Sequence, residues 1–324
     1  MPTQPLVSVL MPCFNAGQYL YSSISSVLNQ TYSNLELIVV DDGSTDSSLA
    51  VASCFNDDRV RVIKNETNLG IVTSRNIGIS HAKGELLACL DADDIALPER
   101  IELQVKFMSE DPELALLGSS AYLIDESGVV FDAADVPETH GDICRNILRG
   151  NSIIHSSVMM RANIVKLLGG YVKDYSLAED YALWIKIASG YKVSNLPERL
   201  VKYRVHSSQI SQTALVEMRK VVSAIQTDSW LSIKESGNVN KILEPIAHTT
   251  WSKLRGHAGT LGYDHLYWAQ HFRRMGCWSN TIDNIFAGIR LSPLCLKFYW
   301  LFLPLCLTPW FWGKRKSLRF SIRR

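Results

Sequence analysis

Polar and acidic residues follow three apolar segments in the first hundred residues of the 324-residue chain. The segments end in Pro12-Cys13-Phe14-Asn15, in Asp41-Asp42-Gly43-Ser44-Thr45-Asp46 and in Asp91-Ala92-Asp93-Asp94. Grouped carboxylates without nearby bases destabilise a fold unless a cation, donor groups or solvent compensate them. A hard divalent ion such as Mg²⁺ or Mn²⁺ takes oxygen ligands of this kind. These residues therefore predict a divalent metal site.

The Asp91-Ala92-Asp93 triplet has the spacing of two ligands on one side of an extended chain. Side chains two residues apart in a strand point to the same side. One carboxylate can therefore hold a metal ion, with a diphosphate completing its ligands, while the other contacts a ribose or shares the ion. Asp42, Asp46 and Asp94 can instead be helix caps or turn residues. That alternative is favoured for Asp46 and Asp94 but not for Asp93.

Apolar runs before these residues predict the strands that position them. The runs are Leu6–Met11, Leu35–Val40, Val60–Ile63, Leu86–Leu90 and Leu114–Leu117. Most lack polar alternation, as expected of central strands buried on both faces. Segments of helical period lie between them, which predicts an α/β fold with right-handed crossovers. Ligands of such sheets bind beyond the carboxyl ends of the strands, where the acidic residues lie.

The pattern changes after Ala121. Turn-rich sequence runs to Gly150, and a strand is expected at Ser157–Met160, with helices near Ala162–Leu168 and Asp180–Ser189. This part is expected to be α+β, and the chain beyond Thr213 mostly helical.

Composition limits the classes of function and the compartment. Lys and Arg number 33 against 32 Asp and Glu, which gives no indication of a nucleic-acid partner. The seven cysteines form no CxxC pair, which favours free thiols and a reducing compartment. The N-terminus lacks the basic and long apolar stretches of a signal peptide, so we expect a cytoplasmic protein.

Five segments, taken together and in order, resemble glycosyltransferase family 2. They are Val9–Asn15, Val39–Asp46, Asn68-Leu69-Gly70, Ser74-Arg75-Asn76-Ile77-Gly78 and Asp91–Asp94. The resemblance runs from Leu6 to about Ser211. It implies a GT-A fold with a mainly parallel, Rossmann-like sheet flanked by helices. It also implies an inverting enzyme of the bacterial polysaccharide or glycolipid type, acting in cell-envelope biosynthesis on a glycan or lipid-linked acceptor.

The resemblance implies how the donor is bound. Asp42 would bond the base of the nucleotide, in a pocket lined by the turn that contains Pro12, Phe14 and Asn15. A carboxylate accepts the imide N–H of uracil or thymine, which favours a UDP- or dTDP-sugar.

In the Asp91-Ala92-Asp93 triplet, Asp91 would face the ribose and Asp93 the metal. Arg75 and Asn76 would lie near the phosphates, which a guanidinium can grip with two hydrogen bonds. A surface ion pair is the alternative for Arg75.

The general base is expected in the second half of the chain. Glu179-Asp180 precedes an apolar helical run that contains Trp184, so Asp180 lies near a helix N-terminus, where the helix dipole favours its ionised form. The segment resembles the family's ED motif, which implies that Asp180 is the base and that Glu179 and Trp184 contact the acceptor. A simple N-cap is the alternative for Asp180.

Two histidines are further candidates. His206, in Tyr203-Arg204-Val205-His206, resembles a family segment whose histidine approaches the metal or the diphosphate. His155 resembles the floor of the acceptor site, although the start of a strand explains it almost as well. A hydrogen-bonded surface histidine is the alternative for His206.

The resemblance divides the chain into a catalytic domain, 1–212, and a helical C-terminal region, 213–324. Within the catalytic domain, 1–120 would bind the nucleotide and 121–212 the acceptor. Leu291–Trp312 is apolar but interrupted by prolines, and six basic residues crowd the tail after it. This suits either peripheral attachment to the inner face of a membrane or packing on protein.

Other classes of function remain open at this point. A nucleotidyltransferase would want a glycine- or lysine-rich phosphate loop after the first strand, and Pro12–Gly17 is not one. A non-catalytic module that binds nucleotide sugars or glycans would tolerate the loss of Asp93 or Asp180, and both are present.

Overall fold

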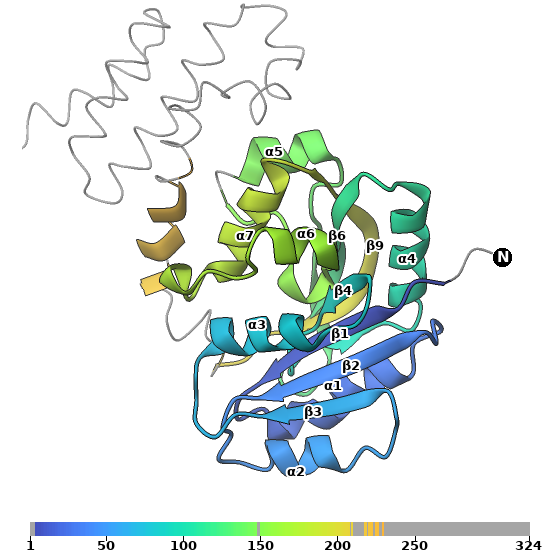
Figure 1. Ribbon diagram of the computed structural model, residues 1–324, viewed down its shortest axis with the longest axis vertical. Helices are drawn as coiled ribbons and strands as arrows, with labels where there is room; N and C mark the ends of the chain where they lie inside the picture. The colour runs from blue at the N-terminus through green and yellow to red at the C-terminus, as the bar shows by residue number, and fades with distance from the viewer. Residues whose placement is uncertain are drawn as a thin grey trace, which may run out of the picture. The chain divides into compact units, whose positions relative to one another are not determined.

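The computed structural model describes residues 4–147, 150–207 and 209, together with 217–218, 220–222, 224–226 and 229. Within these residues the chain forms one nine-stranded sheet with helices packed against it (Figure 1). The strands are β1 Val7–Cys13, β2 Leu35–Asp41, β3 Val60–Lys64, β4 Leu86–Cys89, β5 Ile95–Ala96, β6 Leu114–Ile124, β7 Val130–Ala134, β8 Met159–Arg161 and β9 Lys192–Arg204. The helices are α1 Gly17–Leu28, α2 Ser48–Ser53, α3 Ile71–His81, α4 Arg100–Glu110, α5 His140–Ile147, α6 Ala162–Leu167 and α7 Glu179–Ala188, with 3₁₀ turns η1 His155–Ser157 and η2 Lys173–Tyr175.

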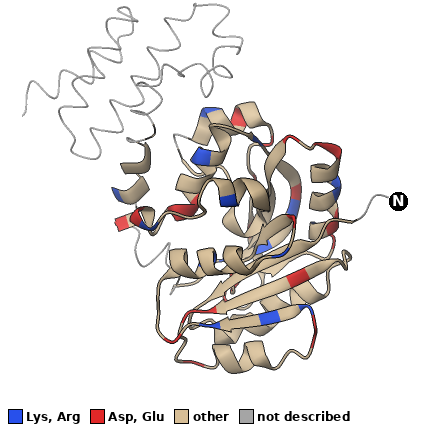
Figure 2. Ribbon diagram, viewed as in Figure 1, with Lys and Arg blue, Asp and Glu red and all other residues tan. Residues whose placement is uncertain are grey.

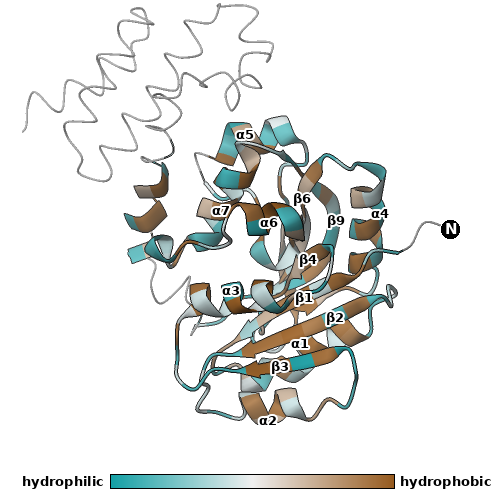
Figure 3. Ribbon diagram, in the orientation of Figure 1, coloured by the Kyte–Doolittle hydropathy of each residue, from teal (hydrophilic) through white to brown (hydrophobic). Residues whose placement is uncertain are grey.

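The first four strands form the parallel part of the sheet. The strand order is β3-β2-β1-β4-β8-β6-β9-β5, with β7 paired to β6, and β1 to β4 run parallel to one another. The brown strands of Figure 3 show how apolar β1, β2 and β4 are, as expected of strands buried on both faces. The predicted α/β fold, with parallel strands flanked by helices, is therefore confirmed.

Alternate residues of these strands face different helices. Val7, Val9 and Met11 of β1 join one core cluster with residues of α1 and α4. The opposite face carries α3, whose Gly78 approaches Leu10 and Val40 so closely that a Cβ there would lie 3.4 Å from the Leu10 side chain. Helices thus cover both faces of the sheet.

The prediction that Val60–Ile63 is a central strand is wrong. β3 lies at the edge of the sheet, where only β2 pairs with it, and its five residues are partly or fully exposed. A short apolar run does not distinguish an edge strand from a central one. The strand expected at Ser157–Met160 begins later, because His155–Ser157 forms the turn η1 and β8 starts at Met159.

Strand β9 connects the second half of the chain to the acidic turn. It runs parallel to β6 along most of its length, and its Val201 and Lys202 pair with β5, which directly follows Asp94. Its last residue, Arg204, therefore arrives beside the Asp91–Asp94 turn. β8 runs antiparallel between β4 and β6 and completes the mixed sheet.

Gly43 is required by the turn after β2. Its φ is +72°, and a Cβ there would lie 2.7 Å from the carbonyl carbon of Thr67. We therefore expect Gly43→Ala to lower the free energy of unfolding by about 1–3 kcal/mol, because it combines backbone strain with a clash against main chain. Urea denaturation measures this change. Gly190→Ala is the matched control, with open space around its Cβ, and should change stability by less than about 1 kcal/mol; equal losses in both variants would contradict the prediction.

Acidic and basic positions are interspersed along the described ribbon (Figure 2). The four described cysteines are free thiols, of which Cys54 is exposed and Cys13, Cys89 and Cys144 are buried. Within the described residues, the structure contains no helix long and apolar enough to cross a membrane. The predicted helical region 213–324, including Leu291–Trp312 and the basic tail, lies outside the described residues apart from scattered positions before 230.

Candidate active site

Arg204 fixes the acidic turn that follows β4. Its main-chain N–H donates to the Asp94 carboxylate at 2.7 Å, and its side-chain Nε donates to the main-chain oxygen of Asp93 at 2.7 Å. The same guanidinium donates to the main-chain oxygens of Asp125 and Glu126. Burial, followed by the charges of Asp93 and Asp91, raises the pKa of Asp94. Asp94 is therefore a buried structural group, in line with the turn role favoured from the sequence.

Asp93 and His206 come together across 113 residues of sequence. Nε2 of His206 lies 2.9 Å from Oδ2 of Asp93, and the imidazole packs 5.2 Å from the ring of Tyr19. Burial and the charge of Asp91 raise the pKa of Asp93, against the hydrogen bond from His206.

One carboxylate and one imidazole make a partial ligand set, because the described residues contain no cluster of three or more metal-ligating side chains. Mg²⁺ and Mn²⁺ sites of this class take one or two carboxylates and complete the shell with substrate phosphates and water. The pair fits such an ion.

The Asp91 carboxylate is held by two basic side chains. Its Oδ1 lies 3.2 Å from Nη2 of Arg75 and 3.3 Å from Nδ1 of His155. Burial raises the pKa of Asp91, but the charges of His155 and Arg75 outweigh it and hold that pKa far below the usual range. Asp91 is therefore anionic at any physiological pH.

Arg75 joins Asp91 to the helix that carries the predicted base. Its second Nη forms an ion pair with Glu179 on α7, and the side chain is only 9% exposed. The alternative of a surface ion pair is wrong, because both carboxylate partners are themselves largely buried. The predicted contact of Arg75 with phosphate stays a prediction.

The turn after β1 holds its shape through the turn after β2. The Asn15 side chain accepts a hydrogen bond from Thr45 N at 2.9 Å, and Asn15 itself has a φ of 51°. Asp46 accepts from Ser48 N and Gly17 N, as its favoured turn role predicts. Pro12 is buried in β1, whereas 47% of Phe14 is exposed beyond the strand ends.

The two carboxylates at the end of β2 differ in their partners. Asp42 accepts from Asn65 Nδ2 and Leu69 N on one oxygen and from Gly70 N on the other, so the loop before α3 occupies most of its acceptor capacity. Asp41 is 1% exposed, and its Oδ1 has no partner among the described residues. The sequence analysis singled out Asp42 as the contact with the nucleotide base and gave Asp41 no separate role.

Asn76 lies against main chain. Its amide accepts from Tyr171 N at 2.9 Å and donates to Tyr171 O at 2.8 Å, which ties α3 to the segment after α6. The predicted position near phosphate is untested, but the side-chain amide already makes two hydrogen bonds. Ala92 is buried within the acidic turn, and its oxygen accepts from Ser23.

Asp180 lies in the first turn of α7 and is partly exposed. Its Oδ2 accepts a hydrogen bond from Asn151 Nδ2 at 3.1 Å, and Ala178 is the N-cap, without a side-chain capping bond. The N-cap alternative for Asp180 is therefore wrong. Trp184, a residue of α7, is fully buried, and its indole N–H has no partner among the described residues.

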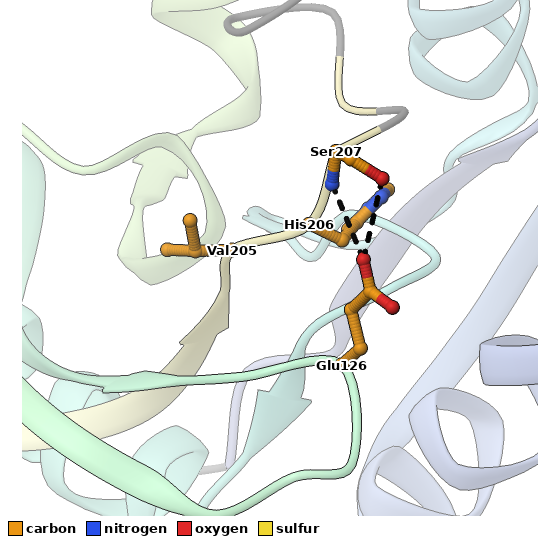
Figure 4. Close-up of a pocket in the computed structure, with 4 residues that line it drawn as sticks. All are labelled: Glu126, Val205, His206 and Ser207. Carbon is orange, nitrogen blue, oxygen red and sulfur yellow. Dashed lines mark hydrogen bonds between the residues drawn. The ribbon is translucent and has the colours of Figure 1, made fainter.

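A cavity of about 520 Å³ opens beside His206. Glu126, Val205, His206 and Ser207 line it, and Glu126 accepts weak hydrogen bonds from the main chain and hydroxyl of Ser207 (Figure 4). The cavity thus adjoins the Asp93–His206 pair.

Comparisons with known proteins identify the class of this site. Residues 8–164 match the family described as glycosyl transferase family 2. An uncharacterised glycosyltransferase of Haemophilus influenzae is 38% identical over 286 residues, covering 78% of this chain and 88% of the relative. The Escherichia coli protein WfgD, a UDP-Glc:α-D-GlcNAc-diphosphoundecaprenol β-1,3-glucosyltransferase, is 31% identical over 66% of this chain and 83% of its own length.

A solved structure shares the fold. The mannosyltransferase PcManGT of Pyrobaculum calidifontis, in complex with GDP-Man and Mn²⁺, superposes with a TM-score of 0.58 at 18% identity over 96% of this chain and 83% of that chain. The protein is thus a nucleotide-sugar-dependent glycosyltransferase. The chain belongs to glycosyltransferase family 2, as the five sequence segments predicted. This assignment supports glycosyl transfer over the nucleotidyltransferase and binding-module alternatives.

Proposed function

We propose that the protein transfers a hexose from a UDP- or dTDP-sugar to a hydroxyl of a glycan or lipid-linked acceptor, with inversion at the anomeric carbon. One observation carries the proposal: Arg75 bonds Asp91 on the donor side and Glu179 on α7 at the same time. A single side chain thereby links the donor-binding turn to the start of α7, where Asp180 directly follows Glu179. The donor and the base are then elements of one site.

On the donor side, carboxylates select the nucleoside. Asp91 has one oxygen held by Arg75 and His155, and the other is available for ribose hydroxyls. Asp42 has one acceptor position left, with which it can accept the imide N–H of uracil or thymine. The UDP-Glc donor of WfgD supports this preference.

Asp93 and His206 would hold a divalent ion, in line with the Mn²⁺ of PcManGT. Such an ion neutralises the charge that develops on the departing diphosphate. The chain's own contribution is to present a carboxylate from the turn after β4 and an imidazole from the segment after β9, and Arg204 ties these two together. Figure 4 shows His206 facing the cavity beside Glu126.

On the acceptor side, Asp180 would take the proton of the attacking hydroxyl. Asn151 orients it: the Asn151 side-chain oxygen accepts from Ile153 N, so the amide NH₂ faces the Asp180 carboxylate. Glu179 is engaged by Arg75 through one oxygen, and its Oε2 is free of described partners to bond a sugar hydroxyl.

One relative supports the proposed class of acceptor. WfgD acts on a diphosphoundecaprenol-linked sugar, and such a lipid stays in a membrane. We therefore propose that this protein works at the inner face of a membrane on a lipid-linked acceptor of cell-envelope polysaccharide synthesis.

A panel of UDP-, dTDP- and GDP-sugars with an undecaprenyl-diphosphate-linked sugar tests the proposal. We expect release of UDP or dTDP and, by NMR of the product, an anomeric configuration opposite to that of the donor. Removing divalent ions with EDTA should lower kcat/KM by about 100-fold or more, and Mn²⁺ should restore it. Retention of configuration, or full activity in EDTA, would overturn the mechanism.

A further inference from the structure

Tyr171 is a buried residue that is held in place through both its main chain and its ring. It follows Gly169 and Gly170, which have φ values of +83° and +69°, and both main-chain polar groups of Tyr171 bond the amide of Asn76. Its ring packs 5.4 Å from the guanidinium carbon of Arg75, and 3% of the residue is exposed. These contacts fix the position of the Tyr171 hydroxyl.

At that point the hydroxyl meets His155 and Cys89. Nε2 of His155 lies 3.1 Å from the Tyr171 oxygen, and Sγ of Cys89 lies 3.5 Å from it. The other ring nitrogen, Nδ1, lies 3.3 Å from Oδ1 of Asp91. With an oxygen beside each nitrogen, a protonated imidazole donates in both directions.

Electrostatics agree with a protonated ring. Burial and the neighbouring guanidinium of Arg75 lower the pKa of His155, but Asp91 and Cys89 more than offset them and raise it to about 10. Trp184 packs on the same ring at 6.0 Å and carries no charge. His155 is only 8% exposed and engaged at both nitrogens, so it faces the donor carboxylate and not an open acceptor pocket.

The position of His155 affects how the Asp91 carboxylate is oriented. Both of its basic partners bond the same oxygen, Oδ1, and no described group donates to Oδ2, while 28% of the side chain is exposed. Two fixed donors on one oxygen determine where the free oxygen points. The orientation of His155 therefore sets the direction in which Asp91 can accept a ligand hydroxyl.

We infer that Tyr171 is a positioning residue for nucleotide binding, which orients His155 and through it the Asp91 carboxylate that contacts the ribose. The inference rests on the proposed donor. It also moves His155 from the acceptor floor, where its sequence context placed it, to the donor side.

Titration of the protein with UDP in the presence of Mn²⁺ tests the inference without requiring sugar transfer. In Tyr171→Phe the ring is kept and only the hydroxyl is lost, so we expect the dissociation constant of UDP to rise about tenfold. The acceptor KM and the kcat at saturating donor should stay within about twofold of the parent. Tyr32→Phe is the matched control: it removes a partly buried hydroxyl that donates to Pro5 O, just before the start of β1, and should leave UDP binding unchanged.

A double-mutant cycle with His155→Gln asks whether Tyr171 acts through His155. We expect the double variant to bind UDP no more weakly than His155→Gln alone. UDP binding by Tyr171→Phe at the parent's affinity, or fully additive losses in the double variant, would overturn the inference. Should Tyr171→Phe fail to fold, His155→Gln alone tests the same path: weaker UDP binding is expected, and UDP binding at the parent's affinity would overturn the inference. Failure of the parent to bind UDP or dTDP would instead overturn the proposed donor, and the inference with it.

Discussion

Asp180→Asn should lower kcat by about 10³-fold and leave the donor KM within about twofold. A general base contributes on the order of 10²–10⁴ to a rate, and an amide cannot accept the hydroxyl proton. The replacement is nearly isosteric, and its side-chain oxygen can still accept the hydrogen bond from Asn151 Nδ2. The geometry at the start of α7 is thus kept, while the basicity of the side chain at position 180 is lost. Steady-state kinetics with varied donor and saturating acceptor measure both constants.

The control for this prediction is Asp174→Asn. Asp174 lies in η2, exposed on the segment that leads into α7, and it belongs to neither the donor nor the acceptor site. The control should retain the parent's kcat. A transfer rate for Asp180→Asn equal to that of the parent would show that another group takes the proton, and the base would then have to be sought elsewhere.

The nucleotide-binding half was readable from sequence because burial on both faces leaves a simple pattern. Val9, Leu37 and Ala88 lie in strands with no polar alternation, and the chain turns directly after each strand into the polar residues that we propose bind the donor. The ends of β1 to β4 were predicted to within one or two residues, whereas β6 runs to Ile124, well past the predicted end at Leu117. The pattern does not report neighbours, which is why the edge position of β3 was missed.

Strand β9 was not predicted. Its sequence contains Pro197 and charged residues such as Glu198, Arg199 and Lys202, and such composition is typical of a loop or an edge. Its stability comes from pairing with β6 and β5, which lie far away in sequence. Only these non-local pairings reveal that Arg204 and His206 arrive at the acidic turn. A resemblance of motifs pointed to His206, but the reason for its position is the strand.

The partners of the site residues were equally hidden. Arg75 meets Asp91 across 16 residues and Glu179 across 104 residues, and no local spacing encodes ion pairs of that range. One signal was available for Asp41: it shares the parity of Leu37 and Val39, so its side chain points to the same buried face of β2. Gly169-Gly170 before Tyr171 was another, because paired glycines ahead of an aromatic residue mark a constrained main chain.

Asp93→Asn should weaken Mn²⁺ binding and lower kcat/KM by about 10³-fold at an Mn²⁺ concentration that saturates the parent. The amide can keep its hydrogen bond to His206 Nε2, so the pair should stay in place while the negative charge is lost. The negative charge of Asp93 should contribute more to metal binding than this hydrogen bond does. Burial and the charge of Asp91 disfavour the anionic form of Asp93, and a bound cation compensates for that cost.

Asp132→Asn, an exposed carboxylate on β7, serves as the control and should not alter the Mn²⁺ dependence. If the Asp93→Asn variant showed the same Mn²⁺ requirement and the same rate as the parent, the metal would lie elsewhere. Raising the Mn²⁺ concentration should recover part of the activity, since His206 and the donor diphosphate still supply ligands.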